Sequence, residues 1–492
     1  MSGPYILAVD QSTQGTKGLL FDSAGALIAR QTVPHKQYVD ENGWVEHDPE
    51  ELLANTLRAA NGAIGQAGVD PGAIAAMGIS NQRETVMAWD RVTGKPLYRA
   101  IVWQCARAEA LCAGLQEHAE EIKARSGLKL SPYFSAGKLS WLLQNVPAVA
   151  EAAAKGTLCC GTIDSWLIFK LSREQAFKTD FSNAARTQLF NIYAGTWDVG
   201  LCRIFGVPPD SLPEVCMSDS LFGTTDLGGW LKRPIPIRGV LGDSNGALLA
   251  QQCLAPGSIK ATYGTGSSVM LQTGERPVRS ETLATSLAWG LGGKRGYVLE
   301  GNVNYAGAVI TWLREEVGLL RTDADCEALA GSANPQDHAC FVPAFTGLGA
   351  PYWDGRATGL LTGITRTTGR AEIVKACVDS IAYQITAVVR RMCADAGIPI
   401  PALRVDGGPT ANRYLMQRQS DLTGAALWVP QLQELSGMGA AFAAGLSAGV
   451  YQTDTMYDSI RYTTYQSQMP PAEREEQFDR WLAAVRQALT HT

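Results

Sequence analysis

Apolar and polar positions along the chain follow two recurring patterns. Short apolar runs bounded by Gly, Ser, Thr or Asn predict strands, for example at 5–10, 75–80 and 403–406. Longer segments predict helices, and residues 48–51 (DPEE) are a typical helix start, because Asp can cap a helix and Pro fits its first turn. The alternation of strands and helices predicts an α/β fold. The helices expected in this way lie at 49–67, 138–145, 306–317, 371–394 and 437–448.

The pattern at the N-terminus recurs halfway along the chain. Residues 5–22 (YILAVDQSTQGTKGLLFD) and 257–274 (GSIKATYGTGSSVMLQTG) each read as a strand, a Gly/Thr-rich turn and a second strand. Further strands and then helices follow in both halves, as expected of an internal repeat. We therefore predict two similar α/β domains, 1–250 and 251–492, with a nucleotide in the cleft between them.

One stretch, 240–268, joins the candidate chemistry of both halves. Asp243 follows an apolar lead-in where a strand gives way to a helix, so its carboxylate is free to reach a ligand. Gly264-Thr265-Gly266 forms a turn after the next strand, and we expect the two glycines to adopt positive φ and let the backbone approach a phosphate. A base and a phosphate turn suit phosphoryl transfer. Taken alone, the stretch fits a helix-capping Asp and an ordinary hairpin equally well.

A second phosphate turn is predicted near the N-terminus. Thr13 and Gln14 offer backbone and side-chain donors to phosphates, and Lys17 adds a cation. Asp10, at the end of the preceding strand, can hold Mg²⁺ through water. Ordinary strand ends also carry an Asp before small residues, so this motif needs the support of the other turn.

Two further groups of residues indicate ligand binding. Arg83 and Glu84 lie side by side at a strand end, where forked donors and acceptors suit a hydroxylated ligand; a surface ion pair is the alternative. Trp103 and Tyr133 either line a polyol pocket or belong to the core.

A Gly-rich turn follows the strand at 403–406. Gly408 lets the backbone approach a flat ligand, and Asn412 in the next turn can form a hydrogen bond with it. This segment is therefore a candidate contact for a flat ligand on the predicted second domain.

Composition narrows the class of protein. The 492 residues are 46% hydrophobic and 18% charged, enough for two or three domains with large cores. A net charge of −5 lacks the basic surface expected of proteins that bind nucleic acid or anionic membranes. Eleven cysteines without metal-ligand spacing, together with no signal peptide and no membrane-spanning apolar run, predict a reduced, soluble, cytoplasmic protein.

Several long stretches resemble one known family almost from end to end. GISNQRET, AIVWQC, PYFSAGKLSWLLQN, GTIDSWL, YGTG, FVPAFTGLGAPYWD, DSIAYQ, LRVDGGPTAN and GMGAAFAAG are similar to segments of the FGGY carbohydrate kinases, most of all those acting on glycerol. The resemblance implies two ribonuclease-H-like (actin-type ATPase) domains with an interdomain cleft. It also implies ATP and Mg²⁺ as cofactors and a small polyol, glycerol first, as substrate.

Two alternative functions stay open. One is an FGGY kinase of a longer polyol or ketose, of the erythritol, ribulose or xylulose type. The other, from a different class, is an actin-like or chaperone-type ATPase that has no sugar substrate. We expect a small-molecule polyol or sugar as partner, without nucleic acid or membrane, and a homodimer or homotetramer as candidate assemblies.

The resemblance also implies the role of each site residue. Asp243 is then the general base and, with Asp10, holds Mg²⁺. The nucleotide-binding residues implied are Thr13, Gln14, Lys17, Gly264, Thr265, Gly408 and Asn412. The substrate-binding residues implied are Arg83, Glu84, Trp103, Tyr133, Asp243, Ser244 and Ser268.

Three features depart from the family pattern. Ser244 follows the base where members acting on glycerol have Gln, and Ser268 stands where they bring a Phe against the substrate carbons. In the loop GGWLKRPIP, Trp230 and Pro234 replace the Gly and Arg expected of the fructose bisphosphate site found in some members. We expect the two serines to loosen specificity for glycerol and the altered loop to remove that allosteric control.

Overall fold

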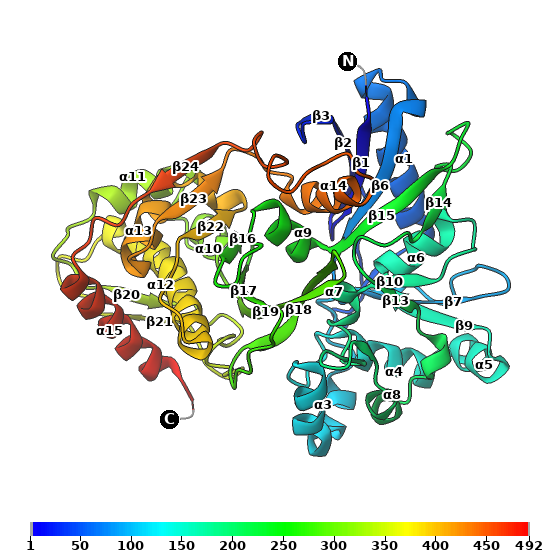
Figure 1. The fold of residues 1–492 in the computed structure, drawn as a ribbon. Coiled ribbons are helices and arrows are strands. Elements are labelled where there is room, and N and C mark those ends of the chain that lie inside the picture. The colour runs from blue at the N-terminus through cyan, green and yellow to red at the C-terminus, as the bar shows by residue number, and fades with distance from the viewer. Residues whose placement is uncertain (1–2, 491–492) are drawn as a thin grey trace.

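The internal repeat appears as two large sheets in the computed structural model, which describes residues 3–490 (Figure 1). The first sheet contains β1 (Tyr5–Gln11), β2 (Gly15–Phe21), β3 (Leu27–Pro34), β6 (Ile74–Asn81), β14 (Gly223–Thr225) and β15 (Ile235–Gly242). The second contains β16 (Ile259–Tyr263), β17 (Ser267–Gly274), β18 (Ala284–Leu291), β19 (Lys294–Val303), β22 (Leu403–Asp406), β23 (Leu427–Pro430) and β24 (Tyr462–Tyr465).

The central strands of the two sheets have the same order and the same directions. The first sheet runs β3-β2-β1-β6-β15, and the second runs β19-β17-β16-β22-β23. In each sheet the first two pairings are antiparallel and the last two are parallel. The predicted repeat and the predicted α/β class are therefore confirmed.

Smaller sheets and helices complete the two lobes. A five-stranded sheet joins β4 (Tyr38–Val39), β5 (Val45–His47), β8 (Ala100–Ile101), β7 (Val86–Asp90) and β9 (Leu158–Thr162). Two-stranded sheets pair β10 (Lys178–Asp180) with β13 (Glu214–Cys216), β11 (Phe190–Asn191) with β12 (Thr196–Trp197), and β20 (Cys340–Val342) with β21 (Leu360–Thr362). The helices of the first half are α1 (Pro49–Ala67), α2 (Glu109–Gly114), α3 (Ala119–Ser126), α4 (Ser135–Asn145), α5 (Pro147–Lys155), α6 (Ile163–Leu171), α7 (Phe181–Ala184), α8 (Val199–Phe205) and α9 (Asp243–Ala250). Those of the second half are α10 (Gly307–Glu315), α11 (Ala324–Ser332), α12 (Arg370–Ala396), α13 (Arg413–Thr423), α14 (Leu435–Ser447) and α15 (Pro471–Ala488).

Helix α14 belongs to the second half of the sequence but packs on the first sheet. Figure 1 shows it beside β1, β6 and β15, while α1 packs against β1, β2 and β3. Small residues permit this approach: a Cβ on Gly78 of β6 would lie 2.4 Å from the carbonyl oxygen of Ala440, and a Cβ on Gly439 would lie 1.9 Å from that of Gly246. The small-residue run of α14 therefore lets its backbone lie directly on β6 and α9.

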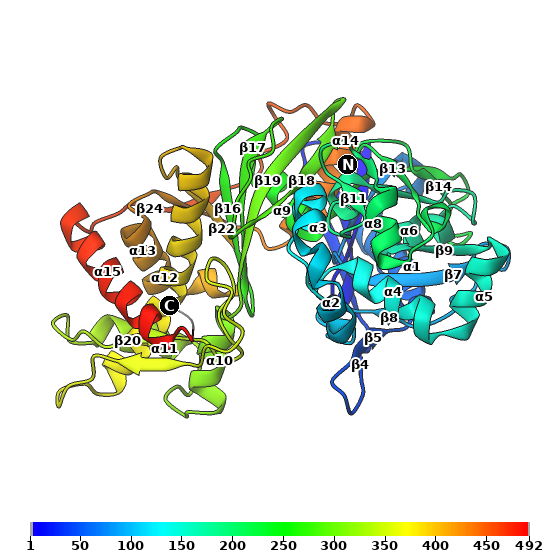
Figure 2. The same cartoon turned by 90° about the horizontal axis from the view of Figure 1, so that it is seen from below.

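The second sheet has one apolar face and one face, here called the polar face, whose polar side chains lie beside the buried apolar Met270 and Val298. Ile259, Ala261, Val269 and Leu299 join α12 in the main hydrophobic core of this lobe. Because side chains alternate across a strand, the intervening polar residues of β16, β17 and β19 lie on the opposite face. Figure 2 shows these strands between the two lobes, so the polar face is the one that meets the first lobe.

The C-terminal helix α15 has one buried side and one charged side. In α15, Phe478 and Trp481 are buried, and Trp481 stacks on Tyr383 of α12 with ring centroids 5.4 Å apart. Only the opposite side of the helix is charged and exposed. Within residues 3–490, no helix combines the length and the apolar character needed to cross a membrane.

Candidate active site

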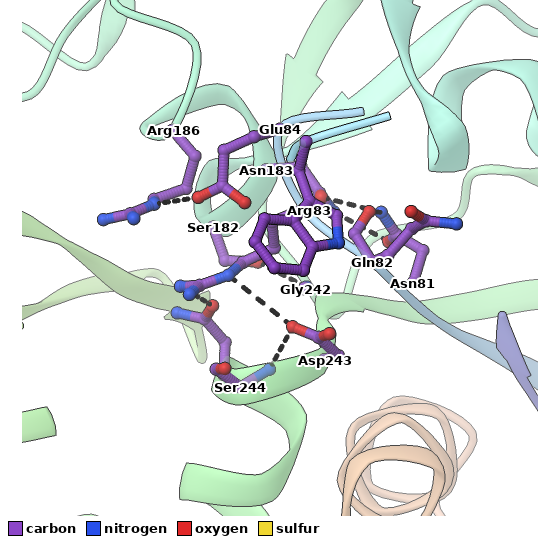
Figure 3. A network of polar contacts seen from close by, with 12 residues as sticks. Asn81, Gln82, Arg83, Glu84, Ser182, Asn183, Arg186, Gly242, Asp243 and Ser244 are labelled. Carbon is purple, nitrogen blue, oxygen red and sulfur yellow. Dashed lines mark hydrogen bonds and ion pairs between the residues drawn. The ribbon is translucent and has the colours of Figure 1, made fainter. Parts of the chain in front are cut away.

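Asp243 is the first residue of α9, directly after β15, as predicted. Its side chain is 37% exposed, and its Oδ1 accepts a 2.6 Å hydrogen bond from the backbone N–H of Ser244. The Nε of Arg83 lies 3.6 Å from the same oxygen (Figure 3). Gly242 makes room for Arg83, because a Cβ there would lie 2.5 Å from the Cδ of Arg83. Asp243 is thus an accessible, oriented carboxylate that can take a proton from a hydroxyl group.

Asp10 is a second carboxylate of the site, buried on β1. It accepts a 2.9 Å hydrogen bond from the hydroxyl of Ser80. Burial, together with the smaller effect of the charge of Asp243, raises the pKa of Asp10 to about 6 against the opposing effect of Lys17. Two carboxylates that repel each other in this way suit a divalent cation.

The residues present fit Mg²⁺ held together with a nucleotide. Among residues 3–490, no group of three or more His, Cys, Asp and Glu side chains is placed to hold a metal ion. Mg²⁺ is commonly bound through one or two carboxylates together with waters and substrate phosphates. Asp10 and Asp243 supply two carboxylates. Their assignment as metal ligands stays a prediction.

The first phosphate turn lies between β1 and β2. Gln14 is exposed, and Thr13 is held from two sides. The indole N–H of Trp103 donates to the hydroxyl of Thr13 at 3.0 Å, and the Nε2 of His35 lies 2.9 Å from the carbonyl oxygen of Thr13. The turn is thereby fixed to neighbouring elements of the first lobe.

Lys17 lies beside this turn but is already paired. Its ammonium is 2.7 Å from Glu434, the residue before α14, and Arg30 is 2.8 Å from the other oxygen of Glu434. The predicted contact of Lys17 with phosphate therefore requires it to share or leave Glu434.

The second phosphate turn does not use its glycines as predicted. Neither Gly264 nor Gly266 has a positive φ, so that expectation is wrong. A Cβ on Gly266 would lie 2.5 Å from the carbonyl oxygen of Val303, so glycine is required there for close packing. The N–H of Gly307, at the start of α10, donates to Gly264, and two N–H groups next to it donate to Thr265. The start of α10 therefore holds the turn.

A cavity of about 800 Å³ opens beside this turn. Asn412 lines it, and its Oδ1 caps α13 by accepting from the N–H of Leu415. Its buried Nδ2 has no hydrogen-bond partner in the part of the chain that the structure describes. Gly408 also lines the cavity, but Gly407 is the strained position, with φ of 101° and a Cβ that would lie 1.9 Å from the carbonyl oxygen of Tyr263. The lining residues are Gly264, Thr265, Gly307, Ala308, Ile310, Thr311, Asp323, Ala324, Glu327, Ala328, Gly408, Pro409, Ala411, Asn412 and Arg413. Its size and unpaired donor suit a nucleoside.

Arg83 and Glu84 are buried, so they do not form a surface ion pair, and each pairs with another residue. The guanidinium of Arg83 donates to both oxygens of Glu300 at 2.7 and 3.0 Å, and the Nε of Arg186 donates to Glu84 at 2.6 Å. Glu84 has φ of 60°, in a tight turn closed by the N–H of Thr85 donating to Arg83. Such strain in a non-glycine residue is typical of functional sites.

Trp103 and Tyr133 are half-buried and face each other, with ring centroids 5.6 Å apart. The loop that carries Tyr133 is held by Lys138, whose buried ammonium donates to the carbonyls of Pro132, Tyr133 and Phe134 at 2.8, 2.5 and 3.1 Å. Burial raises the pKa of Tyr133, which stays a neutral phenol, and lowers that of Lys138 to about 7. The charge of Glu84 also raises the pKa of Tyr133, so this ring pair lies near Glu84. Its role in lining a polyol pocket stays a prediction.

Sequence reasoning missed the stretch around α7, which it treats only as polar and turn-rich. Asn183 exchanges two amide hydrogen bonds with Asn81 at the end of β6, at 2.9 and 3.0 Å. Ser182 accepts from the N–H of Gly242 at 2.9 Å, and Arg186 holds Glu84 (Figure 3). A dense run of buried polar residues was the available signal, since buried polar groups need partners.

The two serines that depart from the family pattern lie on different elements. Ser244 follows Asp243 in α9, and Ser268 lies in β17. The carbonyl of Ser244 accepts from the buried ammonium of Lys260 at 3.3 Å. Ser268 pairs with Asn302 of β19 and Thr262 of β16 in the strand register. Its buried hydroxyl has no hydrogen-bond partner among the described residues. Trp230, by contrast, is exposed in the loop between β14 and β15.

Two family models cover most of the chain. The N-terminal domain of the FGGY family of carbohydrate kinases matches residues 5–250, and its C-terminal domain matches residues 259–448. The chain belongs to the FGGY family of carbohydrate kinases. Each of the two large sheets is thus the central sheet of one ribonuclease-H-like, actin-type domain of this FGGY kinase. The chain is an ATP-dependent kinase.

Individual relatives of this FGGY kinase match it over its whole length. Glycerol kinase 1 of Thermotoga maritima is 43% identical over 99% of this chain and 100% of its own, and the glycerol kinase of Symbiobacterium thermophilum is 43% identical over 99% of each. The crystal structure of Plasmodium falciparum glycerol kinase with ADP is 34% identical, with a TM-score of 0.93 over 99% of each chain. A xylulose kinase structure from Lactobacillus acidophilus, 21% identical with a TM-score of 0.88, shows the shared fold.

Proposed function

We propose that this FGGY kinase transfers the γ-phosphoryl group of ATP to glycerol, giving glycerol 3-phosphate. The observation that carries the proposal is the exposed carboxylate of Asp243, oriented by Ser244 and placed 3.6 Å from the buried Arg83. Relatives named glycerol kinases, matched over their full length, support the choice of substrate.

The site residues divide the work of the reaction. Asp243 takes the proton of the attacking hydroxyl, a task that suits an ionised carboxylate within hydrogen-bond reach. Arg83 and Glu84 offer donors and acceptors to the other hydroxyls, and the rings of Trp103 and Tyr133 exclude water from the carbon chain. In this proposal Asp243 transfers the proton, and the other four side chains bind the polyol.

The nucleotide is held by the second lobe and by both turns. Asn412 and the backbone at Gly408 face the nucleoside, while the turns at 12–15 and 264–266 offer N–H groups to the phosphates. When bound with ATP, Mg²⁺ neutralises the charge that develops on the transferred group, and Asp10 and Asp243 are the residues that would hold it.

An ADP-release assay tests the proposal. Purified enzyme is given ATP and Mg²⁺ with glycerol, erythritol, ribitol, xylulose or ribulose, and a reaction without polyol serves as the control. We expect ADP release that depends on glycerol. Release with only the longer substrates would favour the alternative FGGY kinase, and release that no polyol changes would favour the ATPase without sugar substrate.

We also propose that the enzyme acts in the cytoplasm, on a small-molecule substrate and without nucleic acid or membrane as a partner. All eleven cysteines are free, and Cys216 alone among them is not buried, which suits a reducing compartment. A homodimer or homotetramer stays a prediction, which sedimentation of the purified enzyme tests.

A further inference from the structure

Four buried side chains form a chain of alternating charge next to the site. Glu84 pairs with Arg186 at 2.6 Å, Arg186 with Glu300 at 3.1 Å, and Glu300 with Arg83 at 2.7 Å. Their side chains are between 1% and 5% exposed. Two carboxylates and two guanidinium groups make the set neutral, so removing any one charge leaves a buried charge without its partner.

This row of four charged side chains connects the two lobes. Glu84 and Arg83 lie in the turn between β6 and β7, and Arg186 follows α7, so these three belong to the first lobe. Glu300 lies on the polar face of β19, in the sheet of the second lobe. Burial alone would raise the pKa of Glu300, but Arg186 and Arg83 lower it to about 2, so it stays ionised.

The pairing determines how Arg83 is presented. One terminal nitrogen of Arg83 donates to Glu300 and to Asn245, and the other donates to the second oxygen of Glu300. A bidentate pair fixes the plane of a guanidinium group. That plane leaves the Nε of Arg83 facing Asp243 at 3.6 Å.

We propose that Glu300 and Arg186 are positioning residues for the polyol: through their buried ion pairs they fix Arg83 and Glu84 in the geometry that binds it. Glu300, a carboxylate of the second lobe, thus determines the orientation of the substrate-binding side chains of the first lobe. This inference rests on the proposed function, because it takes Arg83 and Glu84 as the polyol-binding pair.

The test is Glu300→Gln, which keeps the shape and removes the charge. Asp379→Asn is the matched control, since Asp379 is also a buried carboxylate of the second lobe, 3.1 Å from Arg418 and 2.6 Å from Lys375. The KM for polyol, the KM for ATP, kcat and Tm are measured for both variants. Because misplacement by about 1 Å can cost about 10²-fold in rate, we expect Glu300→Gln to raise the polyol KM about tenfold or more and to lower kcat.

The pattern of changes distinguishes positioning from stability. We expect Glu300→Gln to leave the KM for ATP within about threefold of wild type, and Asp379→Asn to lower Tm with the polyol KM unchanged. Loss of folded enzyme alone lowers the apparent kcat and moves neither KM. A polyol KM within about twofold of wild type in folded Glu300→Gln would overturn the inference.

A double variant covers the case in which Glu300→Gln fails to fold. Arg186→Gln with Glu300→Gln removes one charge of each sign and keeps the net charge of the buried set at zero, so we expect Tm to recover. The polyol KM should stay raised, and its return to the wild-type value would overturn the inference. The substrate in every measurement is the polyol that the wild type phosphorylates. If the wild type phosphorylates a longer polyol and not glycerol, the proposed function is contradicted, but Glu300 and Arg186 can still be tested with that polyol.

Discussion

The indole N–H of Trp103 donates a 3.0 Å hydrogen bond to the hydroxyl of Thr13, which ties the predicted first phosphate turn to an aromatic residue predicted to bind the polyol. The ring of Trp103 also packs against Tyr133. Trp103 therefore contacts both a residue predicted to bind phosphate and a residue predicted to bind the substrate. We expect the two binding events to depend on this contact.

Thr13→Val removes the acceptor and keeps the volume. A hydrogen bond of this kind contributes about 1 kcal/mol, so we expect kcat/KM to fall roughly fivefold for both ATP and the polyol. Thr32→Val, at an exposed position of β3, is the control and should leave both values unchanged. Steady-state kinetics with each substrate varied in turn makes the measurement. A loss confined to ATP would show that the contact does not couple the two sites.

Asp243→Asn tests the base. Replacing a general base typically costs about 10²–10⁴-fold in rate, and weaker metal positioning adds to the loss. We expect ATP affinity, measured by calorimetry, to change little, because the cavity beside the second phosphate turn does not include Asp243. A variant that keeps more than about a tenth of wild-type kcat would exclude Asp243 as the base.

How far the sequence predicts the site depends on where each residue's partner lies. Asp243 could be placed correctly because an apolar strand followed by small residues locates a carboxylate at a strand-to-helix junction. Glu300 could not, because it lies within an apolar strand, and nothing local shows that Arg83 and Arg186 face it from the other lobe. Long-range pairing of buried charges leaves no mark in the spacing of a single sequence.

Backbone conformation and helix packing also limit what can be predicted from the sequence. The repeat of hairpins predicts both large sheets, since strand and turn patterns are local. The Gly264-Thr265-Gly266 motif suggests positive φ, yet the requirement at Gly266 is close contact with Val303, which only the folded neighbour creates. The packing of α14 on the first sheet is likewise decided by tertiary contacts at Gly78 and Gly439, 361 residues apart in the chain.

Lys138 predicts a pH dependence of polyol binding. Below its pKa of about 7 the ammonium has three N–H donors for the three carbonyls of residues 132–134, whereas above it the neutral amine has two. One carbonyl then loses its donor, so the loop carrying Tyr133 loosens as pH rises. We expect the polyol KM, measured at saturating ATP, to rise roughly fivefold between about pH 6 and 8.5.

The control for this prediction is Lys138→Arg, because Arg stays protonated over the whole range. Glu84, Cys105, Cys112 and Arg107 also act on the charge of Lys138 and are retained in the variant. We expect its polyol KM to be independent of pH. If the Arg variant shows the same rise as wild type, another group is responsible.

Ser244 and Ser268 predict a broader substrate range than glycerol alone. The resemblance to family members that act on glycerol implies Gln and Phe at these positions, where an aromatic ring would exclude water and leave no room for further carbons. Among residues 3–490 the buried hydroxyl of Ser268 has no hydrogen-bond partner, and Ser268 lies opposite Asn302, so a substrate hydroxyl can satisfy it. We therefore expect glycerol to bind more weakly than in a typical glycerol kinase, and a longer polyol or ketose to reach a comparable or better kcat/KM.

Ser244→Gln combined with Ser268→Phe should reverse that preference. One well-packed apolar contact is worth roughly 1–3 kcal/mol, so the ratio of kcat/KM for glycerol to that for the longer substrate should rise about 10–200-fold. Ser286→Ala is a control, since this buried hydroxyl of β18 also lacks a partner but is not among the predicted substrate-binding residues. It should leave the ratio unchanged. A wild type with micromolar KM for glycerol and no activity on any longer substrate would contradict the argument, and another side chain would then fill the space beside Ser268.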